Sequence, residues 1–434
     1  MLSFSVWFSD FTNRRCNAGR NQATRVIRLT SFFHNLFSHL KEDMSMKKIC
    51  QKEKHTGTIT RRSFIKKSAA MGMGVFATAS MGPWFIKDAL SSSGKLNLFT
   101  WPDYSKPEVI KAFEKATGIK VKVTNYSSNQ ECMNKLRAAR AKGFDIAQPS
   151  LTEYELHMEF ELYQAMDENK ITNLNNLEPS FYETSKKQGG EIRGKRVGLP
   201  YDWGTEAMTF NTDKHNFKYG ELSYGTMWEP EFKQKVTCRP HSVFIGAGLY
   251  LDAIGKVPSD RMFDTYRDET KMRKVYDEIL KFLISKKQNI KMFWNNAQDH
   301  QLAFLQNGCE IGQTWDGPIL TMKKEGKPVT YMAPKEGAMT WVDSMSIVKN
   351  AENLEQAYAF INWAYTPEAG AIIAKSTGYN SVVKGVDALL YEKTKQGFRE
   401  AYPEDALDNL WWYVSEEPWF VPARTEYRDK FQAA

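Results

Sequence analysis

The pattern of hydrophobic and polar residues alternates along the chain between the two-residue period of a strand and the 3.6-residue period of a helix. Residues 95–100 alternate as a strand does, and Ser105 as N-cap with Pro107 in the first turn predicts a helix that ends at Gly118. The same order then repeats, with a strand, a helix and a short strand expected at 119–123, about 129–142 and 144–147. Alternating strands and helices predict an α/β fold with a largely parallel sheet.

Two segments that follow predicted strands are polar and aromatic. In parallel sheets a ligand binds beyond the carboxyl ends of the strands, which places it near residues 101–104 and 149–154. Farther along, the segment Gly-Leu-Pro-Tyr-Asp-Trp-Gly at 198–204 predicts a crossover between two lobes, and a strand is expected at 207–211. The sequence has no visible internal repeat.

The positive charge of the chain is concentrated at its N-terminal end. The formal charge is +8 over 434 residues, but residues 1–79 carry 14 Lys and Arg against 4 Asp and Glu, which leaves 45 against 47 in residues 80–434. The main part of the chain is therefore slightly acidic, which argues against the nucleic acid or membrane surface that the total charge suggests. A hydrophobic fraction of 42% is enough for a large core in two or three units.

An export signal is predicted in the basic region. Residues 61–67, Arg-Arg-Ser-Phe-Ile-Lys-Lys, precede a weakly apolar stretch, and with Thr60 they resemble the twin-arginine motif, from which Ile65 is a mild departure. Small residues at 77–79 fit a cleavage site, and Ala89 is a later alternative. A transmembrane anchor is the other interpretation, but Gly and Ser dilute the apolar run, which is shorter than the ~20 residues that a span needs.

The cysteines do not form the framework of a disulfide-rich protein. No cysteine lies between Cys50 and Cys132, which excludes a lipid-modified cysteine just after the signal. After the signal only Cys132, Cys238 and Cys309 remain, and this odd and sparse set leaves room for one bridge at most.

Seven short segments occur in the order found in one known family. They span about residues 96–379, and through them the sequence resembles the polyamine-binding (spermidine/putrescine) periplasmic proteins of ABC importers. The segments are Trp101–Tyr104, Glu114–Lys120, Phe144–Ser150, Leu199–Gly204, Pro334–Gly337, Trp341–Ser344 and Thr377–Tyr379. A single match of this length is weak, but seven in a fixed order make the resemblance specific.

The resemblance implies a fold and a division of the chain. The fold is the two-lobed type II periplasmic-binding-protein fold, whose lobes are joined by hinge crossovers near Trp203 and Trp315 and close over a ligand. The expected parts are an N-terminal extension with the export signal (1–94), lobe 1 (95–203), lobe 2 (204–315), a return to lobe 1 (316–375) and C-terminal helices mainly in lobe 2 (376–434).

The resemblance also implies a site of aromatic side chains and carboxylates between the lobes. On matching positions the expected ligand-binding residues are Trp101, Tyr104 and Ser150 on one wall, Trp294 and Trp315 on the other, and Asp316 and Asp343 as partners of the amines. Aromatic faces suit this role because a cation over a tryptophan ring gains about 0.5–2 kcal/mol. A desolvated carboxylate adds a charge-assisted hydrogen bond.

Residues 236–244, Val-Thr-Cys-Arg-Pro-His-Ser-Val-Phe, depart from the family pattern. Arg239 and Ser242 stand where the family has a pair of acidic residues. An arginine there would repel a terminal ammonium and could instead pair with a carboxylate or sulfonate. The expected ligand is therefore a small organic cation such as putrescine or spermidine, or else a zwitterion (a betaine, an amino acid or an aminosulfonate) whose anion is held by Arg239.

Each candidate also has an ordinary structural interpretation. Because the chain has 12 tryptophans, Trp294 could belong to the core. Asp343 could cap a helix or a turn, Asp316 could serve a turn in Trp-Asp-Gly, and Arg239 could pair with a structural acid. These alternatives stay open at the level of the sequence.

An enzyme is the function class with the least support. The sequence has neither a Gly-x-Ser-x-Gly nor a His-Glu-x-x-His motif. Cys238, Arg239 and His241 form the one constellation that could act in catalysis, because a nearby cation lowers the pKa of a thiol and a histidine can act as its base. No cofactor, phosphate loop or metal site is expected.

Transport is therefore the predicted function. The sequence predicts a periplasmic protein, exported by the twin-arginine route, that acts as a monomer and delivers a small molecule to an inner-membrane ABC permease. It is expected to bind no nucleic acid. A sensor that presents its ligand-bound state to a receptor uses the same fold, and the sequence does not separate the two roles.

Overall fold

A sheet of eleven strands organises the part of the chain that the structure describes. The computed structural model describes residues 94–434. The sheet runs in the order β2-β1-β3-β11-β6-β9-β7-β8, with β10 and β12 paired to β6 and β13 paired to β11. Its strands are β1 (Lys95–Thr100), β2 (Lys120–Asn125), β3 (Ile146–Ala147), β6 (Leu199–Asn211), β7 (Val236–Cys238), β8 (Ile290–Phe293), β9 (Ile311–Trp315), β10 (Val329–Met332), β11 (Met339–Ile347), β12 (Asn380–Ser381) and β13 (Trp411–Trp412). A separate hairpin joins β4 (Glu191–Ile192) to β5 (Lys195–Arg196).

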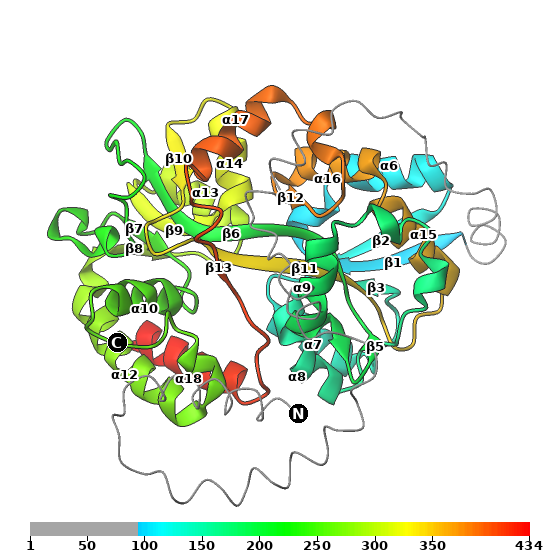
Figure 1. The fold of residues 1–434 in the computed structure, drawn as a ribbon, viewed down its shortest axis with the longest axis horizontal. Coiled ribbons are helices and arrows are strands. Elements are labelled where there is room, and N and C mark those ends of the chain that lie inside the picture. The colour runs from blue at the N-terminus through cyan, green and yellow to red at the C-terminus, as the bar shows by residue number, and fades with distance from the viewer. Residues whose placement is uncertain (1–93) are drawn as a thin grey trace, which may run out of the picture. The chain divides into compact units, whose positions relative to one another are not determined.

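Two long antiparallel strands, β6 and β11, connect the two halves of this sheet. The end of β11 at 346–347 pairs with β3 in the first half, whereas residues 206–210 of β6 pair with β9 in the second half. Every residue of β6 except Asn211 is buried. Both strands run through the middle of the ribbon in Figure 1, and each therefore belongs to both halves.

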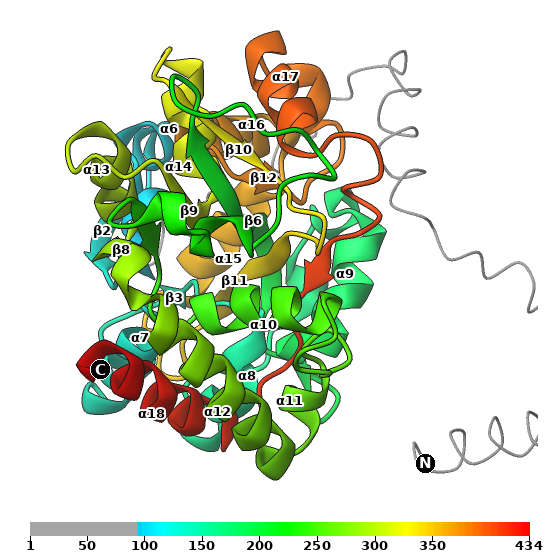
Figure 2. The same ribbon diagram turned by 90° about the vertical axis from the view of Figure 1, so that its left-hand side faces the viewer.

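Helices cover each half of the sheet. In the first half α6 packs against α15 and α16, and in the second half α12 packs against α10 and α18 while α14 contacts β10 and α17. Figure 1 shows α6, α15 and α16 toward one end of β6 and β11 and α10, α12 and α18 toward the other, and Figure 2 shows the second group from its own side. The helices are α6 (Pro107–Thr117), α7 (Asn129–Ala138), α8 (Tyr154–Glu159), α9 (Pro179–Ser185), α10 (Val243–Ala253), α11 (Asp264–Arg267), α12 (Glu269–Lys286), α13 (Ala297–Leu305), α14 (Asp316–Lys324), α15 (Leu354–Ala364), α16 (Pro367–Thr377), α17 (Glu392–Ala401) and α18 (Phe420–Ala433).

The first helix follows from its sequence except at its N-terminus. Helix α6 begins at Pro107 and ends at Gly118, whose φ of 77° is the left-handed conformation that glycine adopts most easily. The predicted N-cap, Ser105, is wrong. Ser105 closes a separate 3-10 turn and its hydroxyl donates to the carbonyl of Pro102, so Lys106 occupies the N-cap position instead.

The other predicted elements exist with different bounds. The helix expected up to residue 142 ends at Ala138, because Arg140 and Ala141 adopt positive φ angles of 53° and 51°. The crossover expected at 198–204 and the strand expected at 207–211 are parts of the single strand β6.

Two elements of the range expected to return to lobe 1 pack in the second half of the sheet. Helix α14 and strand β10, which fall within the range expected to return to lobe 1, pack against β6, β9 and α17 in the second half. The return to the first half runs along β11 and continues into α15 and α16. The exact division into lobes stays a prediction.

Several sequence-based expectations concern the chemistry of the whole chain. Cys132, Cys238 and Cys309 are buried and free, so the single bridge that the sequence left open does not form. Within residues 94–434, no helix combines the length and apolar character of a membrane span.

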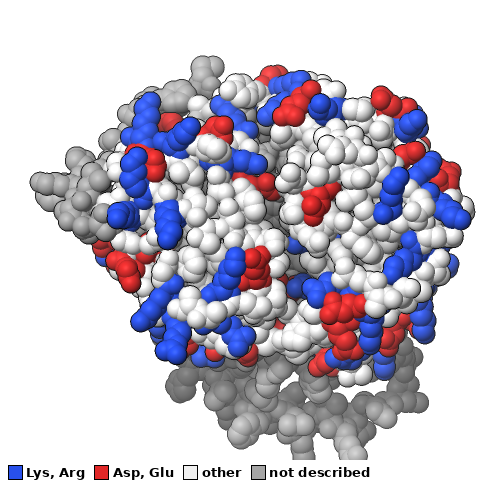
Figure 3. Space-filling model, turned by 180° about the vertical axis from the view of Figure 1, so that it is seen from behind, with Lys and Arg blue, Asp and Glu red and all other residues white. Residues whose placement is uncertain are grey.

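The predicted export signal lies outside the described residues. Figure 3 shows Lys and Arg interspersed with Asp and Glu over one face, which fits the near balance of charge.

A buried aspartate ties the first half of the sheet together. The carboxylate of Asp145 accepts five hydrogen bonds, from the backbone and side chain of Asn97 on β1, the backbone N–H of Glu352, and the backbone and side chain of Asn353 before α15. Substitution by alanine would leave these donors without their acceptor.

We therefore expect Asp145→Ala to lower the free energy of unfolding by about 3 kcal/mol or more. Asp145→Asn keeps one oxygen as an acceptor and should lose clearly less. Urea unfolding followed by tryptophan fluorescence measures both variants. Equal losses in the two variants would contradict the assignment of the stabilisation to these hydrogen bonds.

Candidate functional site

A cavity of about 150 Å³ lies where the strand ends of both halves meet. Six of the eight predicted ligand-binding residues line it, namely Trp101, Tyr104, Ser150, Arg239, Trp315 and Asp343. Trp101 follows β1, Ser150 follows β3, Arg239 follows β7 and Trp315 ends β9. The cavity thus occupies the position beyond the strand ends that parallel sheets offer to ligands.

Asp343 forms the acidic side of the cavity. Ser150 Oγ donates to Asp343 Oδ1 at 2.5 Å, and Tyr104 Oη donates to Oδ2 at 2.6 Å. Burial raises the pKa of Asp343 to about 6, although these two hydrogen bonds and the charge of Arg239 act in the opposite direction. Asp343 forms no ion pair with a described residue.

A second carboxyl group, that of Asp202, is buried beside the first and is not among the residues that line the cavity. Asp202 on β6 is the cross-strand partner of Asp343 on β11, at the place where the register of the two strands shifts. Asp202 is 1% exposed, and neither of its carboxylate oxygens has a hydrogen-bond partner in the described structure. Burial, followed by the charge of Asp343, raises the pKa of Asp202 well above its usual value.

Aromatic rings form the walls between these groups. Trp101 is fixed by a hydrogen bond from its Nε1 to the carbonyl of Gln148 at 2.9 Å, and its ring centroid lies 6.4 Å from that of Trp315. Trp341 and Tyr379, which also line the cavity, pack edge-to-face with centroids 5.1 Å apart. An aliphatic chain placed among these rings would be removed from water.

Two predicted site residues lie behind the cavity wall. Trp294 is fully buried, donates from Nε1 to the carbonyl of Gln313 at 2.8 Å and packs its ring 4.8 Å from Trp315. It supports Trp315 from behind, as the core interpretation of this tryptophan expects. Trp294 is not among the residues that line the cavity, and its predicted contact with a ligand stays a prediction.

Asp316 is likewise turned away from the cavity. Its Oδ1 accepts from the backbone N–H of Gly317 at 2.9 Å, and its Oδ2 accepts from Tyr402 Oη at 2.7 Å and Asn380 Nδ2 at 3.2 Å. Asp316 thus accepts three hydrogen bonds at the start of α14 and is not among the residues that line the cavity. Its predicted role as an amine partner stays a prediction.

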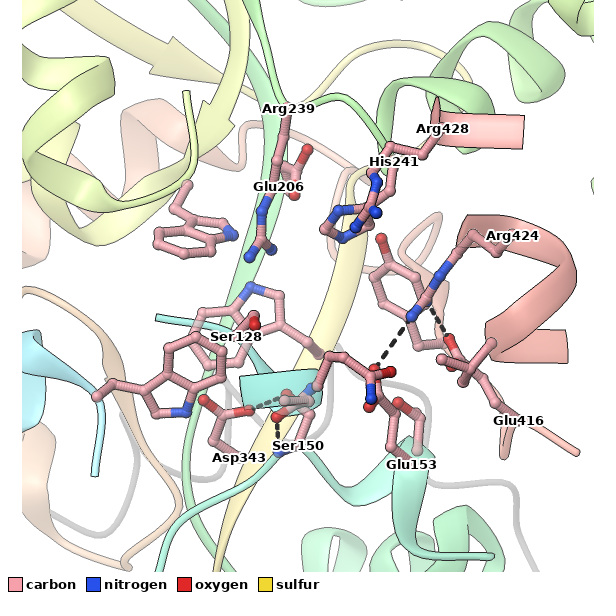
Figure 4. A pocket seen from close by; sticks show the side chains of 18 of the residues that line it. Ser128, Ser150, Glu153, Glu206, Arg239, His241, Asp343, Glu416, Arg424 and Arg428 are labelled. Carbon is pink, nitrogen blue, oxygen red and sulfur yellow. Dashed lines mark hydrogen bonds and ion pairs between the residues drawn. The ribbon is translucent and has the colours of Figure 1, made fainter. Parts of the chain in front are cut away.

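The other side of the cavity is rich in arginine. Figure 4 shows Arg239, His241 and Arg428 reaching the cavity from the side opposite Asp343 and Ser150. Arg239 Cζ lies 4.8 Å from the ring centroid of Trp315, and its guanidinium forms no hydrogen bond or ion pair with residues 94–434. The structural acid that the sequence allowed as its partner is therefore not within ion-pair distance.

Buried ion pairs and hydrogen bonds hold the charged neighbours of Arg239. Arg424 on α18 donates to Glu416 at 2.7 Å and to Glu153 at 3.1 Å. Glu206 on β6 accepts from Ser242 Oγ at 2.5 Å and from Gln313 at 2.6 Å. Ser242 thus holds a carboxylate in place.

The sequence did not identify several of these residues. Asp202 belongs to the Leu-Pro-Tyr-Asp-Trp-Gly segment that predicted the crossover. An acidic residue inside this otherwise apolar segment was the signal from which the sequence could have identified it. Glu206 follows on the same strand, and Trp341 stands two positions before Asp343 on the same face of β11. Arg424 lies in the C-terminal part, where no local pattern points to the cavity.

The constellation around Cys238 does not favour catalysis. Cys238 is fully buried, and burial raises the pKa of its thiol well above the usual value. Burial, together with the charges of Arg239 and other arginines, lowers the pKa of His241 well below its usual value. A protonated thiol beside a weak base is a poor nucleophile. Among the described residues no cluster has the composition of a metal site.

Comparison with known families identifies the class of protein. A family model described as bacterial extracellular solute-binding protein matches residues 108–399. The chain belongs to this family. The solute-binding protein is 27% identical over 291 residues to the spermidine/putrescine-binding periplasmic protein of Salmonella typhimurium, which covers 67% of this chain and 78% of the relative.

Further relatives agree with this assignment. The putrescine-binding periplasmic protein PotF of Escherichia coli is 27% identical over 347 residues, covering 76% of the solute-binding protein and 89% of PotF. The spermidine/putrescine ABC transporter substrate-binding protein PotD of Streptococcus pneumoniae has the same fold, with a TM-score of 0.61, 24% identity, and coverage of 79% of this chain and 99% of that one. These findings confirm the predicted α/β two-lobed fold and the predicted family. All three relatives are named as binding proteins.

Asp202 makes the free solute-binding protein less stable as the pH rises. A carboxyl group whose pKa is raised by folding binds its proton more tightly in the folded state, so stability falls as the pH rises above the unfolded pKa of about 4 toward the folded pKa. We expect Asp202→Asn to raise the melting temperature on the order of a few degrees at pH 8 and by less at pH 5.

Thermal unfolding monitored by circular dichroism without ligand tests this expectation. Asp213→Asn, at an exposed position after β6, removes the same charge and serves as the control. A lower melting temperature for Asp202→Asn at pH 8, or the same change in both variants, would contradict the assignment.

Proposed function

We propose that the chain is the periplasmic solute-binding protein of an ABC importer and that it binds a small organic amine in the cavity. The observation that supports this most strongly is the buried carboxyl group of Asp343 on the cavity wall, with that of Asp202 buried beside it; neither forms an ion pair with a described residue. An ammonium group against Asp343 would supply a counterion and favour its ionised form. Relatives named for spermidine and putrescine support an amine of the polyamine class.

The cavity suits a short ligand. A cavity of ~150 Å³ holds a molecule about as large as benzene, which has as many non-hydrogen atoms as putrescine. The ammonium group would lie beside Asp343, and the aliphatic chain would lie between Trp101 and Trp315. Putrescine is therefore the first ligand of this class to test, ahead of the longer spermidine.

Closure of the lobes would report the bound ligand to the permease. Both β6 and β11 belong to the two halves, so bending of these strands changes the angle between the walls of the cavity. A ligand that contacts both walls favours the closed arrangement. Export by the twin-arginine route would deliver the folded chain, as a monomer, to the periplasm where the curated relatives are named to act.

The affinity for putrescine should fall as the pH falls. Protonation of Asp343, whose pKa is about 6, removes the charge that binds the ammonium group. We expect the dissociation constant to rise about ten-fold or more from pH 8 to pH 5, and binding near pH 7 to release protons as Asp202 and Asp343 ionise. Isothermal titration calorimetry in two buffers of different ionisation enthalpy measures both quantities.

Asp343→Asn is the matched variant for this experiment, since it keeps the shape of the side chain and one acceptor oxygen, so that one of the two hydrogen bonds from Ser150 and Tyr104 can remain. It should bind putrescine weakly and with much less dependence on pH. An affinity that is constant between pH 5 and pH 8, or proton uptake on binding, would argue against the carboxylate pair as the amine site.

Trp315 should contribute through its ring face. We expect Trp315→Ala to weaken putrescine binding by about ten-fold or more. Trp412→Ala is the control, because Trp412 packs against Trp203 and Phe181 and does not line the cavity. Equal weakening in both variants would indicate a general loss of stability instead of a lost ligand contact.

A further inference from the structure

Arg239 presents an unpaired guanidinium to the cavity. It follows β7 and precedes α10, and its Cζ lies 4.8 Å from the ring centroid of Trp315 and 5.5 Å from that of Trp294. A cation over an aromatic ring uses the face of the guanidinium, while the five N–H donors lie in its plane. None of these donors has a hydrogen-bond partner among residues 94–434.

The other arginines of the cavity, and Asp103, form ion pairs with neighbouring residues. Arg424 is paired with Glu153 and Glu416, and Arg428 donates to Asp429 on its own helix. Asp103 pairs with Lys106. Of the arginines that line the cavity, Arg239 is therefore the one whose charge has no counterion within ion-pair distance in the described structure.

Glu206 is the acid best placed to influence Arg239, but it does not neutralise it by contact. Its Oε1 is held by Ser242 and Gln313, and no ion pair joins it to the guanidinium. Burial raises the pKa of Glu206, against the opposing effect of the charge of Arg239. The N–H donors of the guanidinium are therefore not taken up by Glu206.

We propose that the ligand is a linear zwitterion, with its ammonium group at Asp343 and a carboxylate or sulfonate bound by Arg239. The proposal rests on the proposed function for the amine end and adds the chemistry of the other end. Figure 4 shows Arg239 and Asp343 entering the cavity from opposite sides, so one extended molecule can contact both. A second ammonium group in place of the anion would lie against the positive charge of Arg239.

A matched pair of ligands tests this directly. In 4-aminobutyrate a carboxylate replaces one aminomethyl group of putrescine, with nearly the same length. Calorimetry with the full-length chain at pH 8 should give an affinity for 4-aminobutyrate about 100-fold or more above that for putrescine. This comparison uses the unaltered protein, so it does not depend on the folding of any variant.

Arg239→Gln should invert the preference. Loss of the guanidinium should weaken 4-aminobutyrate about 100-fold or more and leave putrescine unchanged or tighter. Arg239→Lys keeps the charge without the planar fork and should give an intermediate affinity. Arg399→Gln removes the same charge from an exposed pair with Glu392 and should change neither affinity.

The outcomes separate this inference from the proposed function. If putrescine binds and 4-aminobutyrate does not, or if Arg239→Gln leaves the two affinities in their original order, the zwitterion is wrong and the amine site stands. If neither putrescine nor 4-aminobutyrate binds to the unaltered protein, both proposals fail. Preference for 4-aminobutyrate that depends on both Asp343 and Arg239 supports both.

Discussion

The burial of Asp343 beside Asp202 is the constraint on which the site depends. Two neighbouring carboxyl groups away from water oppose each other's ionisation, and burial raises the pKa of both. Ser150 and Tyr104 donate hydrogen bonds that favour the ionised form of Asp343, but no described residue forms an ion pair with either acid. Such a pair lowers the stability of the free protein, which is the usual cost of a site prepared for a charged ligand.

The sheet explains how these groups come together. The antiparallel register of β6 and β11 places the two acids opposite each other, and the same strands pass into both halves of the sheet. The strand ends on either side then supply the rest, with Trp101 and Ser150 from one half and Arg239 from the other. Buried Trp294 holds the ring of Trp315 in place from behind. The site is therefore a product of the topology as much as of any local motif.

The sequence predicted the part of the site that follows from local patterns. Trp101 stands one residue and Ser150 three residues after a predicted strand, so the general position of ligands in parallel sheets placed both near the predicted site. Asp316 is one residue beyond Trp315, and its direction depends on the start of α14, which the sequence did not resolve. Asp202 lies beside Asp343 because β6 pairs with β11, which is far away in the sequence. The hydrophobic periodicity of a single segment does not predict which distant strand it pairs with.

The register of β6 and β11 shifts between Asp343 and Ser344. An irregularity of this kind bends its strand locally and increases the twist. If the proposed closure turns the two halves about this point, Asp343 moves least, whereas the walls that carry Trp101 and Arg239 move farthest. An entering amine would meet its charged anchor before the walls arrive. Selection would then proceed in two stages: capture by charge in the open protein, and discrimination of the other end of the molecule as it shuts.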